Sequence, residues 1–464
     1  MTNPLDGTDR ARLLHAVADT LDAAADELVP LAAEETHLPI PRLTGELART
    51  TFQLRLYADE ITAGRVDDVR EDPADPGWPT GPRPSLTRIR VPIGPVLIFA
   101  ASNFPFAFSV AGTDTAAALA AGCPVVVKAH PGHPKLSRRV AALVSDVLPA
   151  GAFTLIEGEQ AGRDALLDPR IRAAAFTGSL AGGRALFDLA ASRPEPIPFY
   201  GELGSVNPAF VTRAAMESRG DEILRGFAGS YTLGLGQFCT KPGVLLVPAG
   251  LRAEQALTGI LADVPGGMLL NERIAGGHRD ARAELAAHPG VRVAVAGQAD
   301  GTSAAPALLV TDTGTILDVL HEAFGPTAIL VEYTSPEELL TLAARLPGQL
   351  TATVHAEPDE PITGPLLREL AGHAGRVILN GWPTGVSVSP AMHHGGPYPA
   401  TTAPLHTSVG TAAIDRFLRP VTFQNVPDAA RLFRVSPDSR VSRVSPDSGV
   451  SRVSPDSRVS RETA

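Results

Sequence analysis

Hydrophobic residues in the first part of the chain recur at the spacing of one helix face. They form two sets: Leu13, Val17, Leu21 and Ala24, and then Leu43, Leu47, Leu54 and Ile61. This period predicts two or three amphipathic helices between about residues 9 and 64. Residues 65–85 break the pattern and contain a polar, proline-rich loop at residues 72–79; residues 86–91 then largely alternate apolar and polar side chains. Such alternation is typical of a half-exposed strand.

Short, continuous apolar runs replace this pattern from residue 96 onward. The runs lie at residues 96–100, 124–128, 153–156 and 173–177. Helical stretches at residues 110–121 and 136–148 separate the first three of them. Strands that are apolar on both faces and alternate with helices indicate a parallel α/β sheet.

The same alternation restarts after residue 217. Strand-like runs lie at residues 244–247, 291–295 and 328–331, and a helix-like stretch lies at residues 337–346. The sequence therefore predicts a second α/β unit, and a late strand at residues 417–424.

Residues 434–464 form a repeat with a period of nine residues. Near-copies of Arg-Val-Ser-Pro-Asp-Ser-Arg-Val-Ser begin at Arg434, Arg443 and Arg452. This segment contains six arginines, three aspartates and one glutamate, so its formal charge is +2, while that of the rest of the chain is −12. Few of its residues could form a core, which predicts a disordered extension without a catalytic role. The Ser-Pro steps leave an interaction or phosphorylation role open.

The composition bounds the class of protein. A chain of 464 residues that is 44% hydrophobic and 19% charged is globular and long enough for two or more domains. The net charge of −10 argues against a nucleic-acid partner. No run of about 18 apolar residues predicts a membrane span, and no secretory signal is visible.

The cysteines and histidines predict neither a disulfide framework nor a metal site. Cys123 and Cys239 are the two cysteines of the chain, so a cytoplasmic location with free thiols is the simpler interpretation. No Cys/His cluster has the spacing of zinc ligands. The adjacent pair His393 and His394 would point apart on a helix or strand, so we expect no metal there.

Polar residues follow the predicted strands of the first unit. Asn103, Lys128 and the pair Gly178 and Ser179 lie at or just after strand ends. Ligands bind beyond the carboxyl ends of the strands in parallel sheets, so we expect these residues to line one crevice. The structural alternatives are a turn residue for Asn103 and a surface lysine with a buried stem for Lys128.

Cys239 lies in a stretch rich in glycine, residues 234–243. Small residues let the backbone approach a ligand closely, and a thiol in such a place is a candidate nucleophile. Free cysteine is also one of the most buried residue types, so a structural thiol is the alternative. The other motifs of the chain favour the nucleophile.

Four short motifs follow one another in the chain. They are Ala-Ser-Asn-Phe-Pro at 101–105, Glu-Leu-Gly at 202–204, Gly-Gln-Phe-Cys at 236–239 and Glu-Ala-Phe-Gly-Pro at 322–326. With these four motifs in this order, the chain resembles the aldehyde dehydrogenase superfamily over nearly all of residues 10–427. Several longer stretches are most similar to the α-ketoglutaric semialdehyde (2,5-dioxopentanoate) dehydrogenases: residues 101–114, 127–131, 380–386 and 394–401.

The resemblance implies an α/β, aldehyde dehydrogenase-like fold: two doubly wound parallel-sheet domains, Rossmann-like, plus a small oligomerisation β-sheet. Residues 1–83 and 92–209 would form the dinucleotide-binding domain, and residues 210–412 the catalytic domain. Residues 84–91 and 413–427 would supply strands to a sheet that joins a homodimer or homotetramer.

The resemblance also implies a chemistry. Cys239 would attack the aldehyde to form a thiohemiacetal, whose oxyanion the Asn103 side chain and the Cys239 N–H would stabilise. Hydride transfer would leave a thioester, and Glu202 would be the general base for its hydrolysis. The alternative for Glu202 is a solvated or capping carboxylate, which its apolar, glycine-flanked setting disfavours.

The cofactor positions that the resemblance implies are Lys128, Gly178, Ser179, Gly183, Glu322 and Phe324. A lysine at a strand end reaches ribose hydroxyls or a phosphate, and small residues at a helix start admit a pyrophosphate. Glu322 would bind the nicotinamide ribose and Phe324 would pack beside the ring; an exposed acid and a core aromatic are the alternatives.

One position bears on the choice of cofactor. Many relatives that prefer NAD have a carboxylate three residues after the lysine, where this chain has Pro131. No carboxylate would then repel a 2′-phosphate, so the expected cofactor is NADP, with NAD possible. Arg163, Arg170 or Arg172 could supply a cation to that phosphate.

The resemblance leads to the NAD(P)-dependent oxidation of 2,5-dioxopentanoate to 2-oxoglutarate. Other short-chain or fatty aldehydes are alternative substrates, and a non-catalytic dinucleotide-binding protein is the alternative of another class. Glu202 argues against a CoA-acylating enzyme, whose relatives usually lack this base. Ser205 and Val206 depart from the commonest superfamily pattern, which has glycine and lysine there.

Overall fold

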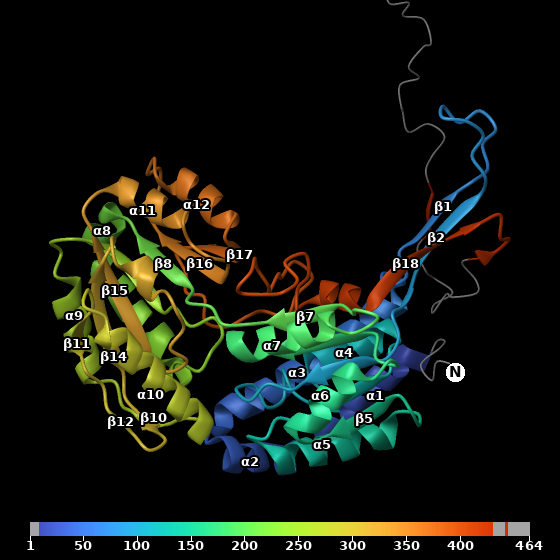
Figure 1. Cartoon of the computed structure of the whole chain (residues 1–464), viewed down its shortest axis with the longest axis horizontal. Helices are drawn as coiled ribbons and strands as arrows, with labels where there is room; N and C mark the ends of the chain where they lie inside the picture. The colour runs from blue at the N-terminus through green and yellow to red at the C-terminus, as the bar shows by residue number, and fades with distance from the viewer. Residues whose placement is uncertain (1–8, 430–440, 444–464) are drawn as a thin grey trace, which may run out of the picture.

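The computed structural model describes residues 9–429 and 441–443, which form two lobes and a projecting arm (Figure 1). The first lobe contains a five-stranded sheet in the order β5-β4-β3-β6-β7, with every neighbouring pair parallel. Its strands are β3 (Val96–Phe99), β4 (Val125–Lys128), β5 (Phe153–Ile156), β6 (Ala173–Thr177) and β7 (Phe199–Glu202). Each of the four apolar runs predicted in this part of the chain lies in one of these strands.

Helices cover both faces of the five-stranded sheet, because successive side chains of a buried strand point to opposite faces. Ile98 and Val127 pack into a core with the first five helices, whereas Leu97 and Phe99 pack on the other side with the last two. In chain order these helices are α1 (Asp9–Ala23), α2 (Ala25–Thr36), α3 (Ile40–Thr62), α4 (Thr113–Ala121), α5 (Pro134–Val147), α6 (Glu159–Leu167) and α7 (Leu180–Ala191).

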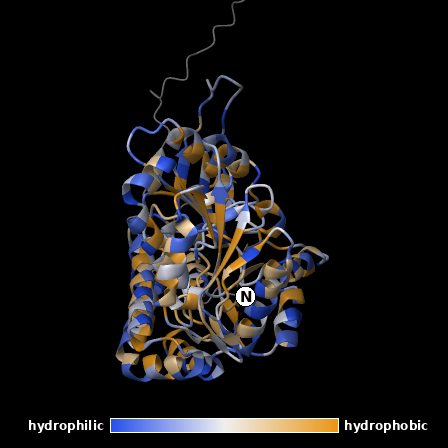
Figure 2. Cartoon of the chain, turned by 90° about the vertical axis from the view of Figure 1, so that its left-hand side faces the viewer, coloured by the Kyte–Doolittle hydropathy of each residue, from blue (hydrophilic) through white to orange (hydrophobic). Residues whose placement is uncertain are grey.

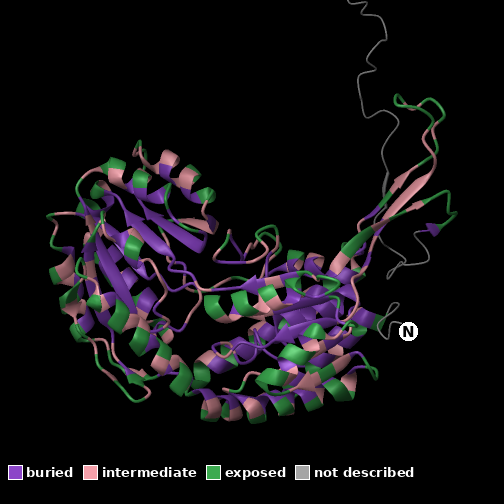
Figure 3. Ribbon diagram, in the orientation of Figure 1, coloured by how far each residue is buried: buried purple, intermediate pink, exposed green. Residues whose placement is uncertain are grey.

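The second lobe contains a seven-stranded sheet in the order β11-β14-β15-β9-β8-β16-β17, parallel except for the pair β11 and β14. Its strands are β8 (Pro208–Val211), β9 (Val244–Pro248), β11 (Arg292–Val295), β14 (Ala307–Asp312), β15 (Thr327–Tyr333), β16 (Gln349–His355) and β17 (Ala374–Leu379). Figure 2 shows these strands as the hydrophobic interior of the lobe, and Figure 3 shows that they are mostly buried. The predicted run at 291–295 is therefore an antiparallel edge strand.

Helices also cover both faces of the seven-stranded sheet. One core contains residues of α8 (Arg213–Thr232) and α9 (Ala253–Ala262). The opposite core contains residues of α10 (Glu272–Ala287), α11 (Pro336–Ala343) and α12 (Thr363–Ala371). The remaining described elements of this lobe and its connections are β10 (Gly267–Met268), β12 (Ala299–Asp300), β13 (Ser303–Ala304), η1 (Leu233–Gly236), η2 (Ile316–Val319) and η3 (Thr411–Phe417).

The arm is a small sheet in which β2 (Leu86–Pro92) pairs antiparallel with both β18 (Leu418–Gln424) and β1 (Val69–Asp72). The sequence predicts no strand within residues 65–85, where the structure has β1. This strand contains one buried apolar residue, Val69, so its sequence carries no alternation and only the pairing with β2 defines it. Both strands predicted for the oligomerisation sheet lie in this arm.

The C-terminal repeat contributes one short strand to the arm. β19 (Val441–Arg443) pairs parallel with β1, which differs from the expectation of a disordered tail at these residues. The rest of that prediction, over residues 434–440 and 444–464, lies outside the described residues. Within the described chain, no helix combines the length and the apolar character that a bilayer crossing needs.

Candidate active site

The loop that carries Cys239 owes its shape to three residues in the left-handed region. Gly234, Leu235 and Gly236 have φ values of 55°, 56° and 66°. A Cβ at Gly236 would overlap the Gly325 carbonyl, so a side chain there would separate the loop from the turn at residues 322–326. The glycines thus bring the cysteine loop against a segment more than eighty residues away in the sequence.

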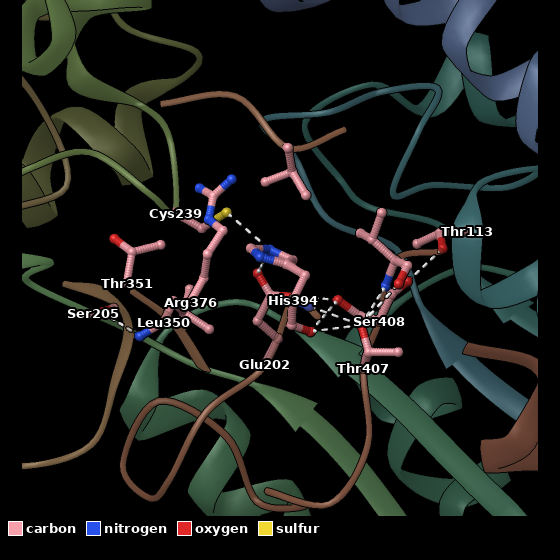
Figure 4. Close-up of polar contacts among 12 residues, drawn as sticks. Thr113, Glu202, Ser205, Cys239, Leu350, Thr351, Arg376, His394, Thr407 and Ser408 are labelled. Carbon is pink, nitrogen blue, oxygen red and sulfur yellow. Dashed lines mark hydrogen bonds and ion pairs between the residues drawn. The ribbon is translucent and has the colours of Figure 1, made fainter. Parts of the chain in front are cut away.

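Cys239, His394 and Glu202 form one cluster of side chains (Figure 4). His394 Nε2 lies 3.6 Å from the Cys239 sulfur and 3.0 Å from Glu202 Oε1. Ser408 donates from its hydroxyl to the other Glu202 oxygen at 2.8 Å. The imidazole thus lies between a thiol and a carboxylate, both in hydrogen-bonding range.

Two backbone pairings place Glu202 beside the segment that follows His394. Glu202 ends β7, where it forms an isolated bridge with Thr401. The Leu203 N–H donates to the Ala400 carbonyl at 2.8 Å. Because β7 is an edge strand of the five-stranded sheet, its outer side is available for this pairing, which fixes the histidine segment against the sheet.

The charges of the cluster act on one another. Burial raises the pKa of the Cys239 thiol well above its usual value, and the charge of Glu202 adds to the shift. Burial also acts to raise the pKa of Glu202, but the charge of His394 and hydrogen bonds from His394, Ser408 and Cys239 outweigh it and lower that pKa. At neutral pH the cluster therefore holds a protonated thiol and an ionised carboxylate.

Asn103 lies next to the cysteine loop, as the sequence predicts for a residue beyond the end of β3. Its Nδ2 donates to the Gln237 carbonyl at 3.1 Å, and its backbone carbonyl accepts from the Arg42 guanidinium at 2.6 Å. Among the described residues, the Cys239 N–H has no acceptor. An amide side chain and a free N–H thus lie in one loop cluster, which is the donor set that an oxyanion requires.

A buried polar network binds the backbone of the cysteine loop. Asn207 donates from Nδ2 to the Cys239 carbonyl at 2.8 Å and to the Lys241 carbonyl at 2.9 Å. Ser205 Oγ lies 2.9 Å from Asn207 Oδ1 and 3.0 Å from Gln349 Oε1. The buried Leu350 N–H donates to Ser205 Oγ at 3.0 Å, and glycine at position 205 would remove this acceptor, so the structure explains the departure from the commonest superfamily pattern.

Lys241 connects the cysteine loop to the segment that carries Glu322 and Phe324. Its buried Nζ donates to the carbonyls of Ala323 at 2.6 Å and Thr327 at 2.9 Å. Burial lowers the pKa of Lys241 to about 8 and raises the pKa of Glu322 to about 7, while the opposite charge of each limits the shift of the other. Glu322 therefore lies beside the cysteine loop on a segment that a lysine fixes.

The predicted cofactor residues of the first lobe lie at the carboxyl ends of neighbouring strands. Lys128 ends β4, and Ser179 caps α7 by accepting from the Gly182 N–H at 3.3 Å. Gly178 and Ser179 are exposed, so the first N–H groups of α7 are open to solvent. A Cβ at Gly183 would overlap Leu203, so this glycine is required for α7 to pack on the segment after β7.

These residues fit a dinucleotide. An accessible helix N-terminus suits a pyrophosphate because of its free N–H groups and its dipole. Burial lowers the pKa of Lys128, and the charge of Glu159 opposes this shift. A half-buried cation of this kind is suited to ribose hydroxyls or a phosphate.

The cluster also offers ligands to a metal ion. Glu202, Cys239 and His394 place one ligand atom each within 4.8 Å of one another, and no other group of this kind occurs among the described residues. The sequence predicts no metal, and a soft ion there would occupy the thiol that the reaction needs.

Sequence reasoning missed the position of His394. The sequence placed it in a stretch similar to semialdehyde dehydrogenases but considered its side chain only as a partner of His393. Its contact with Glu202 spans 192 positions of the chain, which no spacing rule can reveal. The anchoring role of Lys241 was missed for the same reason.

Comparison with known proteins gives consistent results. The aldehyde dehydrogenase family matches residues 3–423. The chain is 45% identical to alpha-ketoglutaric semialdehyde dehydrogenase 2 of Azospirillum brasilense, over 90% of this chain and 83% of that protein. It is 43% identical to an alpha-ketoglutaric semialdehyde dehydrogenase of Acinetobacter baylyi, over 90% and 82%. The crystal structure of an NAD-dependent aldehyde dehydrogenase from Sinorhizobium meliloti superposes with a TM-score of 0.75 at 23% identity, over 91% of this chain and 83% of that one.

Proposed function

Since the chain belongs to the aldehyde dehydrogenase family, whose members oxidise aldehydes with NAD(P), we propose that its substrate is 2,5-dioxopentanoate and its product 2-oxoglutarate. The identities of 45% and 43% to two semialdehyde dehydrogenases support this substrate. The single observation that supports the reaction is the buried cluster of Cys239, His394 and Glu202.

Cys239 is the nucleophile in this proposal. Its raised pKa means that the thiol must lose a proton before or during attack, and the ionised carboxylate of Glu202, which hydrogen-bonds to Cys239, is the base that accepts it. His394 donates from Nε2 to Glu202 Oε1 at 3.0 Å and holds this carboxylate in place. The Asn103 amide and the Cys239 N–H stabilise the oxyanion of the thiohemiacetal.

The nicotinamide cofactor, when bound, supplies the hydride acceptor that turns this adduct into a thioester. Glu202, directly or through His394, then takes the proton of the water that hydrolyses the thioester. Its lowered pKa keeps it ionised, and so able to act as a base, at neutral pH.

The cofactor belongs to the first lobe in this proposal, with Lys128 at the adenosine ribose and the start of α7 at the pyrophosphate. Gly178, Ser179 and Gly183 shape that helix start. Pro131 in place of a carboxylate favours NADP over NAD. Glu322 and Phe324, on the segment fixed by Lys241, would hold the nicotinamide end.

We also propose the domain and assembly roles of the lobes. The five-stranded lobe would bind the dinucleotide, the seven-stranded lobe would carry catalysis, and the arm would join a homodimer or homotetramer. A cytoplasmic location stays a prediction from the sequence.

Reduced-nicotinamide formation tests the proposed substrate. The purified protein would be assayed with 2,5-dioxopentanoate and a panel of simple aldehydes, with NADP and NAD in parallel. A clear preference for the dicarbonyl acid is expected, with NADP the better cofactor. Equal activity on all aldehydes would remove the named substrate, and no activity on any would leave a dinucleotide-binding protein.

A further inference from the structure

Two arginines lie within electrostatic reach of Cys239 and have no carboxylate partner at ion-pair distance among the described residues. Arg49 belongs to α3 of the first lobe and Arg376 to β17 of the second. Both are half-buried, and the charge of Cys239 acts on each. Figure 4 shows the Arg376 side chain drawn beside Cys239.

A short series of contacts connects Arg49 to the reactive cluster. Its guanidinium carbon lies 5.6 Å from the centre of the Phe108 ring. That ring lies 6.3 Å from the ring of His394, edge to face. Since His394 contacts the Cys239 sulfur, Arg49 lies one aromatic ring away from the catalytic cluster.

Most of the hydrogen-bonding capacity of Arg49 is unused. Its one hydrogen bond among the described residues is a long one of 3.4 Å to the Val386 carbonyl, whereas a guanidinium has five donors. Glu46, one turn earlier on α3, accepts at Oε1 from the N–H groups of Phe106 at 2.8 Å and Ala107 at 3.0 Å, and its Oε2 has no partner among the described residues. The charge of Glu46 acts on Arg49, but the two side chains form no direct ion pair.

Arg376 approaches the same loop from the other lobe. It donates to the carbonyls of Pro383 and Gly385, while its buried Nε has no partner among the described residues. The two arginines thus hold the loop at residues 383–386 between them. One edge of this loop, at Val386, packs with Phe104 and Phe108 beside the oxyanion loop.

Half-buried cations without a counter-ion are unfavourable unless a ligand supplies the charge. Arginine suits a carboxylate because its planar fork binds both oxygens at once. A carboxylate four carbon–carbon bonds from an aldehyde bound to Cys239 is the chemistry that would bring such a charge here. We propose that Arg49, assisted by Arg376, binds the substrate carboxylate and so selects aldehydes that carry an acid at the far end. This inference rests on the proposed semialdehyde substrate.

Kinetics of Arg49→Met test the proposal, with three aldehydes: 2,5-dioxopentanoate, succinic semialdehyde and the neutral pentanal. We expect kcat/KM to fall about 10- to 100-fold for both acids, the size of a lost charged hydrogen bond, and to change little for pentanal. Arg49→Lys should retain part of the preference for acids. Arg55→Met is the matched control on the same helix, because Arg55 pairs on the surface with Asp19 and Asp22.

The outcomes of these assays distinguish the proposed substrate from the proposed carboxylate site. A wild-type preference for succinic semialdehyde over 2,5-dioxopentanoate would remove the proposed substrate. It would keep the carboxylate site if Arg49→Met lowers kcat/KM for both acids but not for pentanal. Equal loss on pentanal and the acids in both Arg49 variants would overturn the carboxylate site, and so would a wild type that prefers pentanal. Thermal melting of each variant shows whether the fold is retained.

Discussion

His394 Nε2 lies 3.0 Å from Glu202 Oε1, and the two side chains are 2% and 5% exposed. The contact joins the end of β7 in the first lobe to a segment that follows the last strand of the second. An ionised carboxylate this close to Nε2 accepts its N–H and fixes the ring, and the ring in turn positions the carboxylate. Because the Cys239 sulfur lies 3.6 Å from the same nitrogen, His394 holds Glu202 beside the thiol.

Replacing His394 should lower the rate. We expect His394→Phe to reduce kcat/KM about 10- to 100-fold, because the Glu202 carboxylate would lose the hydrogen bond that positions it, and a hydrogen bond to a charged group contributes about 1.5–3 kcal/mol. Binding of NADP should be unchanged, since the predicted dinucleotide site lies at β4 and α7. Steady-state kinetics and fluorescence titration with NADPH measure both. His393→Phe is the control, and near wild-type activity in His394→Phe would contradict the role.

Alkylation should distinguish the two thiols. Burial raises the pKa of Cys123 to about 11, and this side chain is fully buried, whereas Cys239 is partly accessible. Because the pKa of Cys239 is also raised, its thiolate fraction should increase steadily as the pH rises from 7 toward 9. Iodoacetamide should therefore label Cys239 faster at higher pH, measured by peptide mass spectrometry. A labelling rate independent of pH over this range would show a thiolate already formed at neutral pH.

Pro131→Glu should change the preference for the cofactor. A carboxylate at this position would repel the 2′-phosphate, and like charges brought together at a binding site cost several kcal/mol. We expect the ratio of kcat/KM for NADP to that for NAD to fall at least about tenfold, with Pro131→Ala as the control. An unchanged ratio in Pro131→Glu would mean that the 2′-phosphate lies elsewhere.

The buried ion pair of Arg416 and Asp114 should stabilise the fold. Arg416 lies 2.8 Å from Asp114, with both side chains less than one-tenth exposed. Arg416→Met leaves an uncompensated buried charge, which typically costs about 3–5 kcal/mol, so the thermal midpoint should fall clearly. Arg184→Met, which breaks the exposed pair of Arg184 and Asp188, should leave the midpoint unchanged. Equal midpoints for the two variants would contradict this.

The sequence predicts those parts of the fold that have a local cause. Val125, Val126 and Val127 form a continuous apolar run because both faces of β4 are covered: Val125 and Val127 pack into one core and Val126 packs against the other, so the strand is visible in the sequence. β1 exists through its pairing with β2, and its own residues carry no such pattern. The motifs that carry Asn103 and Cys239 are local as well, and the structure brings their loops together, with Asn103 Nδ2 donating to the Gln237 carbonyl.

The contacts of the site are less predictable. The distance between His394 and Glu202 depends on how two lobes meet, and the partner of Lys241 is a set of backbone carbonyls that no side-chain pattern marks. Pairing of this kind is a property of the tertiary structure. An acidic substrate implies a cation near the site. Which arginine supplies it depends on α3 and β17 meeting at the same loop.

The most direct test of the central claim is to trap the acyl-enzyme. Glu202→Gln removes the base while Cys239 remains, so incubation with aldehyde and NADP should leave a thioester that hydrolyses slowly. Intact-mass and peptide mass spectrometry should then find the acyl group of the substrate on the peptide that contains Cys239, and one equivalent of NADPH should form in a burst. Steady turnover at the wild-type rate, or an acyl group on another residue, would contradict the assignment of Cys239 as nucleophile and Glu202 as base.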